Sequence, residues 1–219
     1  MNTTDNTRYD GILRTATYHH SLCRIKHQKM NSSQIENFFN KISKGPCWNV
    51  QKGIGSFLTF EFGKPQLKLT EPKMWSQLRS PLNQHKIRRV FLEGTEKLWI
   101  YCVDWVIYNN EIEIAQNESK DEQIDDATNL LNGQILNAIE VDTEIGETKF
   151  LFDLGGQLVT CNKTHNEMDE SWMLYINDSV LTMNNSGQFS LDNSNQVISN
   201  ENFETIYEKR IKVTLHNNK

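Results

Sequence analysis

Two Glu-x-Lys triplets have residue types and spacing that could support metal-dependent hydrolysis: Glu71-Pro72-Lys73 and Glu147-Thr148-Lys149. Many metal-dependent nucleases hold Mg²⁺ with an upstream Asp and a strand Glu, and a Lys two residues further on orients the attacking water. Asp142 lies upstream of the second triplet, which begins an apolar strand pattern. With 28 acidic and 23 basic residues in the chain, however, such triplets arise readily by chance. We keep a Mg-dependent nuclease as an alternative and favour solvated strand ends.

A second candidate lies in two segments that resemble each other, residues 56–63 and 148–155. Both have dense apolar strand patterns, and each places an acid two positions before a glycine, Glu61 in the first and Asp153 in the second. If two copies of one hairpin unit bury their apolar faces against each other, these carboxylates could meet. Paired carboxylates can serve acid–base chemistry or bind a cation. Strand alternation offers the plainer interpretation, in which Glu61 faces solvent.

A third acid, Asp104, interrupts the most apolar strand pattern of the chain, which runs from Leu98 to Tyr108. A carboxylate in such a place faces water, pairs with a cation or lines a site, and a structural ion pair is the favoured interpretation. Two arginines on the expected partner strand are its predicted counter-ions. A small-molecule or nucleotide pocket between the repeated units is the alternative, and its candidate residues are Glu61, Asp104, Asp153, Arg88 and Arg89.

Other chemical signatures are missing from the sequence. Gly53-Ile54-Gly55 lacks the Gly-Lys-Ser/Thr of a phosphate loop, and neither a Gly-x-Ser-x-Gly elbow, an HExxH motif nor an EF-hand loop occurs. The four cysteines are widely spaced, without the close pairs that a zinc site needs. We therefore assign no catalytic residue, no metal ligand and no cofactor, and the sequence favours a protein that is not an enzyme.

Binding residues are predicted on two kinds of element. Trp48 and Trp75 lie beside Gly or Pro in expected loops, where an aromatic side chain often anchors a binding surface. Asp121, Glu122 and Asp125 lie on a predicted acidic helix that could meet a basic protein partner.

The composition limits the class of protein. The chain has 219 residues, 37% of them hydrophobic and 10% aromatic, which suits one domain with a sizeable core or two small subdomains. A net charge of −5 makes nucleic acid an unlikely partner. No apolar run approaches the roughly 20 residues of a membrane span, and no secretory leader is recognisable, so we expect a cytoplasmic protein with free thiols. A homo-oligomer is left open.

Helix and strand signals together favour an α+β fold. A short helix carrying Ile35, Phe38, Phe39 and Ile42 is predicted after the caps at 31–33, and a longer amphipathic helix over 119–139, capped by Ser119. Hairpins are predicted at 56–70, 89–108, 148–161 and 171–183, and a last strand within 203–215. The predicted fold is α+β, with antiparallel β-rich sheets built from two related hairpin units and two or three helices packed on them.

The predicted organisation has four parts. Residues 1–30 form a basic N-terminal segment, 31–118 the first hairpin unit with its preceding helix, 119–140 a connecting helix, and 141–219 the second unit with the C-terminal strand. The duplicated sheet, acidic balance and aromatic loops favour a non-catalytic, bacterial-type cytosolic module that binds a macromolecule, most simply a protein. An immunity-like or regulatory, defence-associated role would fit such a module.

Overall fold

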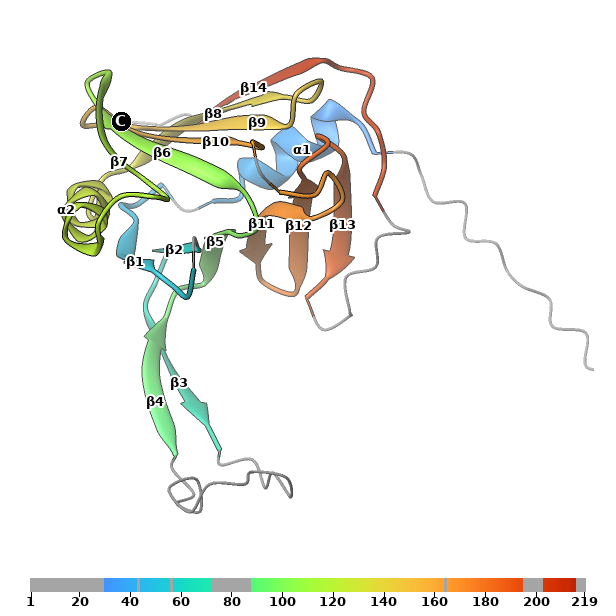
Figure 1. The fold of residues 1–219 in the computed structure, drawn as a ribbon. Coiled ribbons are helices and arrows are strands. Elements are labelled where there is room, and N and C mark those ends of the chain that lie inside the picture. Colours follow the sequence, from blue (N-terminus) through green and yellow to red (C-terminus); the bar gives the residue numbers. More distant parts are fainter. Residues whose placement is uncertain are drawn as a thin grey trace, which may run out of the picture.

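Two six-stranded antiparallel sheets form the body of the protein (Figure 1). The structure is a computed structural model that describes residues 30–42, 44–55, 57–71, 88–163, 165–194 and 203–215. The first sheet has the strand order β1 (Trp48–Lys52), β2 (Leu58–Phe62), β5 (Glu96–Ile100), β11 (Glu170–Ile176), β12 (Ser179–Asn184) and β13 (Phe189–Asn193). The second has the order β14 (Arg210–Thr214), β8 (Leu136–Asp142), β9 (Glu147–Phe152), β10 (Gly156–Cys161), β6 (Asp104–Asn109) and β7 (Ile112–Gln116).

The two sheets share one hydrophobic core. Trp172 of the first sheet is fully buried, and its ring centroid lies 6.0 Å from that of Phe150 in the second sheet and 5.9 Å from that of Phe189. Phe39 of helix α1 (Ser32–Phe39) contacts the same indole at 5.7 Å between centroids. The indole N–H donates to Thr148 Oγ1 at 2.9 Å, so the polar atom of this core side chain is also satisfied.

The expected α+β character and antiparallel pairing are confirmed, and so is the start of the first helix. Asn31 caps α1 through a capping box with Gln34, in which each side chain bonds the other residue's backbone N–H. Ile35, Phe38 and Phe39 are buried, as their spacing predicts.

The second helix is shorter than predicted. Helix α2 spans Asp121–Leu131, and its N-cap is Lys120, whose side chain makes no capping hydrogen bond. Ser119 instead accepts a hydrogen bond from the backbone N–H of Gln116 through its hydroxyl. Gly133, at φ 95°, turns the chain toward β8, so the apolar residues after it belong to a strand. Over a few residues, the apolar pattern of a buried strand resembles that of a helix face. Here the turn at Gly133 ends the helical region, and the residues after it form the strand.

The predicted hairpin at 56–70 is wrong, whereas β9 and β10 pair as a hairpin as expected. Strand β2 pairs with β1 and β5, and β3 (Gln66–Thr70) pairs with β4 (Arg89–Glu93). The two similar segments thus have different partners, although they touch across the core, where the rings of Phe60 and Phe152 stack at 6.2 Å between centroids. The alternation of apolar residues predicts which side of a strand is buried, but it does not predict which strand pairs with it.

Strands β2–β3 and β4–β5 run alongside each other as one long bent ribbon, whose outer half projects from the body (Figure 1). We call this outer half, β3 with β4, the arm. Gly63, at φ 70°, lies at the bend, and a Cβ on the facing Gly94 would collide with the carbonyl oxygen of Phe62. The predicted pairing within 89–108 is therefore also wrong, because β4 and β5 follow one another along the same side of the ribbon.

Two further expectations change with the topology. The apolar run 98–108 is not one strand: β5 ends at Ile100 in the first sheet, and β6 begins at Asp104 in the second. Within the described residues 203–215, only Arg210–Thr214 forms a strand, and Glu204 makes an isolated bridge to Phe189. Trp75 and the predicted basic segment, apart from Met30, lie outside the described residues.

Candidate functional site

One face of the arm is made of exposed aliphatic side chains. Leu67 lies opposite Leu92 and Leu69 opposite Val90 in the β3–β4 register, so all four project from the same side of the ribbon. Their exposed fractions are 73%, 55%, 52% and 54% in that order. We call this set of four residues the aliphatic face.

The arm leaves these side chains exposed because it has no covering layer among the described residues. Strands β3 and β4 contact each other extensively and the remainder of the described chain only marginally. A two-stranded ribbon buries neither of its faces by itself, and isolated ribbons are marginally stable in water. Contiguous exposed apolar side chains are typical of interaction surfaces.

A shallow apolar pocket of about 450 Å³ continues the aliphatic face at the base of the arm. Leu92 belongs to both, and Trp48, Pro46 and Pro65 line the pocket beside it. The indole N–H of Trp48 donates to the carbonyl oxygen of Gly63 at 3.1 Å, which holds the ring against the bend of the ribbon. We call this hollow the Trp48 pocket. Trp48, a predicted partner-binding residue, therefore lies next to the arm.

Charged side chains mark both ends of this surface. Lys64 lines the Trp48 pocket and is exposed. At the far end, Arg88 makes two hydrogen bonds to Glu71, at 2.9 and 3.0 Å. Because both of these side chains are well exposed, the pair contributes little to stability, typically about 0–1 kcal/mol.

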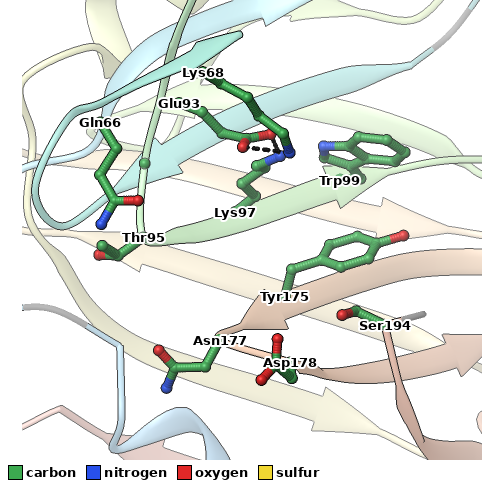
Figure 2. A pocket seen from close by; sticks show the side chains of 11 residues that line it. Gln66, Lys68, Glu93, Thr95, Lys97, Trp99, Tyr175, Asn177, Asp178 and Ser194 are labelled. Atoms are coloured by element: carbon green, nitrogen blue, oxygen red, sulfur yellow. Dashed lines mark hydrogen bonds and ion pairs between the residues drawn. The ribbon is translucent and has the colours of Figure 1, made fainter. Parts of the chain in front are cut away.

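The opposite face of the arm carries mostly polar side chains, with Phe91 among them at 42% exposure. It opens into a second pocket, of about 520 Å³, which we call the basal pocket (Figure 2). Glu93 of β4 accepts from Lys68 at 2.6 Å and also pairs with Lys97 of β5. Trp99 and Tyr175 lie beside these charges with their ring centroids 5.3 Å apart. Trp99 is 36% exposed.

Glu61 lies next to the basal pocket without lining it. Its carboxylate accepts the backbone N–H of Gly94 at 2.8 Å, and the residue is only 9% exposed, so alternation wrongly predicted a solvent-facing acid. Burial raises the pKa of Glu61, while the Gly94 hydrogen bond and the nearby lysines oppose that shift. Burial also lowers the pKa of Lys97, its cross-strand neighbour.

The other two predicted pocket acids have partners of their own. Asp104 accepts from Asn117 Nδ2 and from the backbone N–H of Lys163, both at 3.0 Å, and His165 Nε2 lies 4.0 Å away. Asp153 accepts the backbone N–H of Ile135 at 2.8 Å. A common pocket for these two carboxylates and Glu61 remains a prediction.

The predicted arginine counter-ions of Asp104 are wrong. Arg88 pairs with Glu71, and Arg89 is an exposed residue of β4. Strand β4 pairs with β3, whereas the strand of Asp104, β6, pairs with β7 and β10. The prediction is wrong because residues 98–108 do not form one strand: β5 ends at Ile100, and Asp104 begins β6 in the other sheet.

The acids of the nuclease alternative do come together. Asp142 lies directly opposite Glu147 in the β8–β9 register, and both line a pocket of about 430 Å³ with Lys149. Each acid has a basic neighbour: Arg210 Nε lies 3.3 Å from Asp142, and Lys149 Nζ lies 3.4 Å from Glu147. Within the described part of the chain, no group of three or more His, Cys, Asp or Glu side chains could hold a metal ion.

The acidic helix residues lie on the exposed side of α2. Asp121 pairs with Lys52 of β1 at 2.6 Å, and this pairing lowers the pKa of Asp121. Glu122 and Asp125 are exposed. Their opposite helix face packs on β1 and β7 through Ile124 and Ala127, which are fully buried.

Three cysteines in the described residues are free thiols, as predicted. Cys47 is fully buried, and burial raises its pKa to about 11. Its thiol donates to the carbonyl oxygen of Leu131 at 3.1 Å. A buried, protonated thiol is a poor nucleophile, so this residue serves packing.

The aliphatic face was not among the predicted site residues. Leu67 and Leu69 alternate with polar residues, which is the pattern of a strand with one buried side, and alternation cannot reveal that the covering layer is missing. The local net charge is the sequence signal that could have identified residues 66–93 as a distinct segment. Residues 66–93 carry six basic and two acidic side chains, a net charge of +4, in a chain whose total is −5.

Neither helix of the described residues has the length and apolarity required to cross a membrane. Comparison of the chain with models of protein families, with curated proteins and with solved structures finds no match.

Proposed function

We propose that the protein is a non-catalytic module that binds another protein through the aliphatic face and the Trp48 pocket. The observation that carries the proposal is the exposure of Leu67, Leu69, Val90 and Leu92 on one side of a projecting ribbon. Covering such side chains with a partner removes apolar surface from water, which stabilises a complex by about 25 cal/mol per Å² before the costs of association.

The partner that fits this surface is an amphipathic segment with apolar side chains and nearby carboxylates. Its apolar side chains would cover the aliphatic face, and one large side chain would enter the Trp48 pocket beside Lys64. The sequence from residue 66 to residue 93, which begins with β3 and ends with β4, has a net charge of +4, and this leaves −9 for the remainder of the chain. An acidic partner therefore suits this segment better than the remainder of the chain.

A protein fits this face better than a nucleic acid does. Nucleic acids are held mainly through their phosphates by Lys, Arg and hydrogen-bond donors, and the four side chains of the aliphatic face offer none. Regulatory and immunity-like roles, in which one protein covers a surface of another, suit a binding module of this kind.

The test is capture from a lysate of the native host, followed by reconstitution. Leu67→Ser with Leu92→Ser should remove a partner that the unmodified protein retains, and the purified partner should bind the double variant at least tenfold more weakly, about 1.4 kcal/mol. Leu154→Ser is the matched control, because Leu154 is 68% exposed and lies in the turn after β9. Calorimetry with the purified partner measures both variants.

Three outcomes would contradict the proposal: no retained partner depends on the two leucines, the control weakens binding as much as the double variant, or the retained material is nucleic acid.

A further inference from the structure

We propose that the basal pocket binds a neutral saccharide unit. This second site lies on the polar face of the arm, away from the aliphatic face, and it does not depend on the protein-binding function. Its walls come from the arm on one side, through Gln66 and Lys68, and from the β11–β12 turn on the other, through Asn177 and Asp178 (Figure 2). A ligand in this pocket would therefore bridge the arm and the body.

The floor of the pocket is aromatic: Trp99 is 36% exposed, and Tyr175 beside it is half-buried. The rings of Trp99 and Tyr175 are tilted by 58° with their centroids 5.3 Å apart, so they form an angled platform. Tyr175 pairs with Lys97 in the β5–β11 register, which places the platform next to the pocket's charged groups. The C–H face of a pyranose ring stacks on such a platform, because it is apolar and carries weakly positive hydrogens that match the negative ring face.

The polar lining offers both donors and acceptors. Gln66 and Asn177 contribute amides, Thr95 and Ser194 contribute hydroxyls, and Asp178 contributes a carboxylate. An amide or a hydroxyl can donate and accept, whereas a carboxylate can only accept. A ligand with several hydroxyl groups matches this mixture, since each hydroxyl can also do both.

The charges of the pocket favour a neutral ligand. Two lysines, Lys68 and Lys97, face two acids, Glu93 and Asp178, so the formal charges cancel. Glu93 already lies against both ammonium groups. A phosphate that approached these lysines would meet the Glu93 carboxylate and would have to separate existing ion pairs, which disfavours a nucleotide. The volume of about 520 Å³ lies within the ~300–1,000 Å³ typical of ligand pockets.

The test is NMR titration of the whole protein with glucose, galactose, mannose, N-acetylglucosamine and their β-linked disaccharides. We expect saturable shifts of the Trp99 indole N–H for at least one sugar, with an affinity near the millimolar range. Trp99→Ala should weaken binding at least tenfold, and Gln66→Ala severalfold. Trp48→Ala is the control, because that tryptophan lines the pocket on the other face of the arm and should leave saccharide affinity unchanged.

Adenosine monophosphate and inorganic phosphate serve as charged counter-probes. Glu93→Gln gives the lining a formal charge of +1 and should increase phosphate affinity at least tenfold while saccharide binding persists. The proposal is overturned if no sugar shifts the Trp99 signal, if Trp48→Ala and Trp99→Ala weaken binding equally, or if the nucleotide binds the unmodified protein more tightly than every sugar. Loss of partner binding in Trp48→Ala with intact sugar binding would separate the two sites.

Discussion

At the scale of single residues, Glu61 is a carboxylate buried at the bend of the ribbon, beside Gly94. The carboxylate is nearly covered, and burial raises its pKa above the ordinary value of 4.5. The folded state thus binds this proton more tightly than the unfolded chain does. The free energy of unfolding must therefore fall as the pH rises from about 4.5 through the folded-state pKa.

Glu61→Gln should remove this loss, because an amide does not titrate and its oxygen can still accept the Gly94 N–H. We expect the stability of the variant relative to the unmodified protein to increase with pH across this window. Urea unfolding at a series of pH values from 4 to 7 measures the difference. Glu113→Gln, at an exposed position of β7, should show no such trend. A pH-independent difference for Glu61→Gln would contradict the assignment.

At the scale of elements, the capping box of α1 can be tested directly. Asn31→Ala leaves the backbone N–H of Gln34 without its side-chain acceptor and should lower the free energy of unfolding by about 1 kcal/mol. Chemical denaturation measures the loss. Ser33→Ala, an exposed position on the same helix, is the control and should change stability by less than about 0.5 kcal/mol. Equal losses in the two variants would show that the cap does not stabilise the helix.

The same elements show which signals the sequence contains. The helix cap at Asn31 and the β11–β12 hairpin, which turns at Asn177 with φ 54°, are local features, because backbone groups within a few residues decide them. A cap within 31–33 and a hairpin over 171–183 were both predicted. The break after Ile100 and the separation of β2 from β3 depend on strands distant in the sequence. Local patterns describe what a strand can bury, and pairing partners are selected by the whole sheet. Trp48, which the sequence suggests as a partner-binding residue, therefore does line a pocket. The aliphatic face beside it could not be predicted from local patterns.

At the scale of the whole molecule, Trp172 couples the two sheets and α1. Trp172→Ala would leave a cavity between Phe39, Phe150 and Phe189 and should cost about 3–5 kcal/mol. Because the core is continuous, the loss should appear as one earlier transition, seen alike by near- and far-ultraviolet circular dichroism. Trp99→Ala, in the exposed platform, should cost far less. Two separate transitions would show that the sheets unfold independently.

The position of the arm along the chain has one more consequence. Strands β2 and β5 are hydrogen-bonded neighbours, yet the covalent path between them runs out along β3 and back along β4. Cleavage at a protease site engineered into the segment after Glu71 would yield two fragments, each contributing strands to the first sheet. Inter-strand hydrogen bonds and the common core would still join them. The protein is therefore a natural candidate for fragment complementation, in which two separately produced halves reassemble into the native sheets.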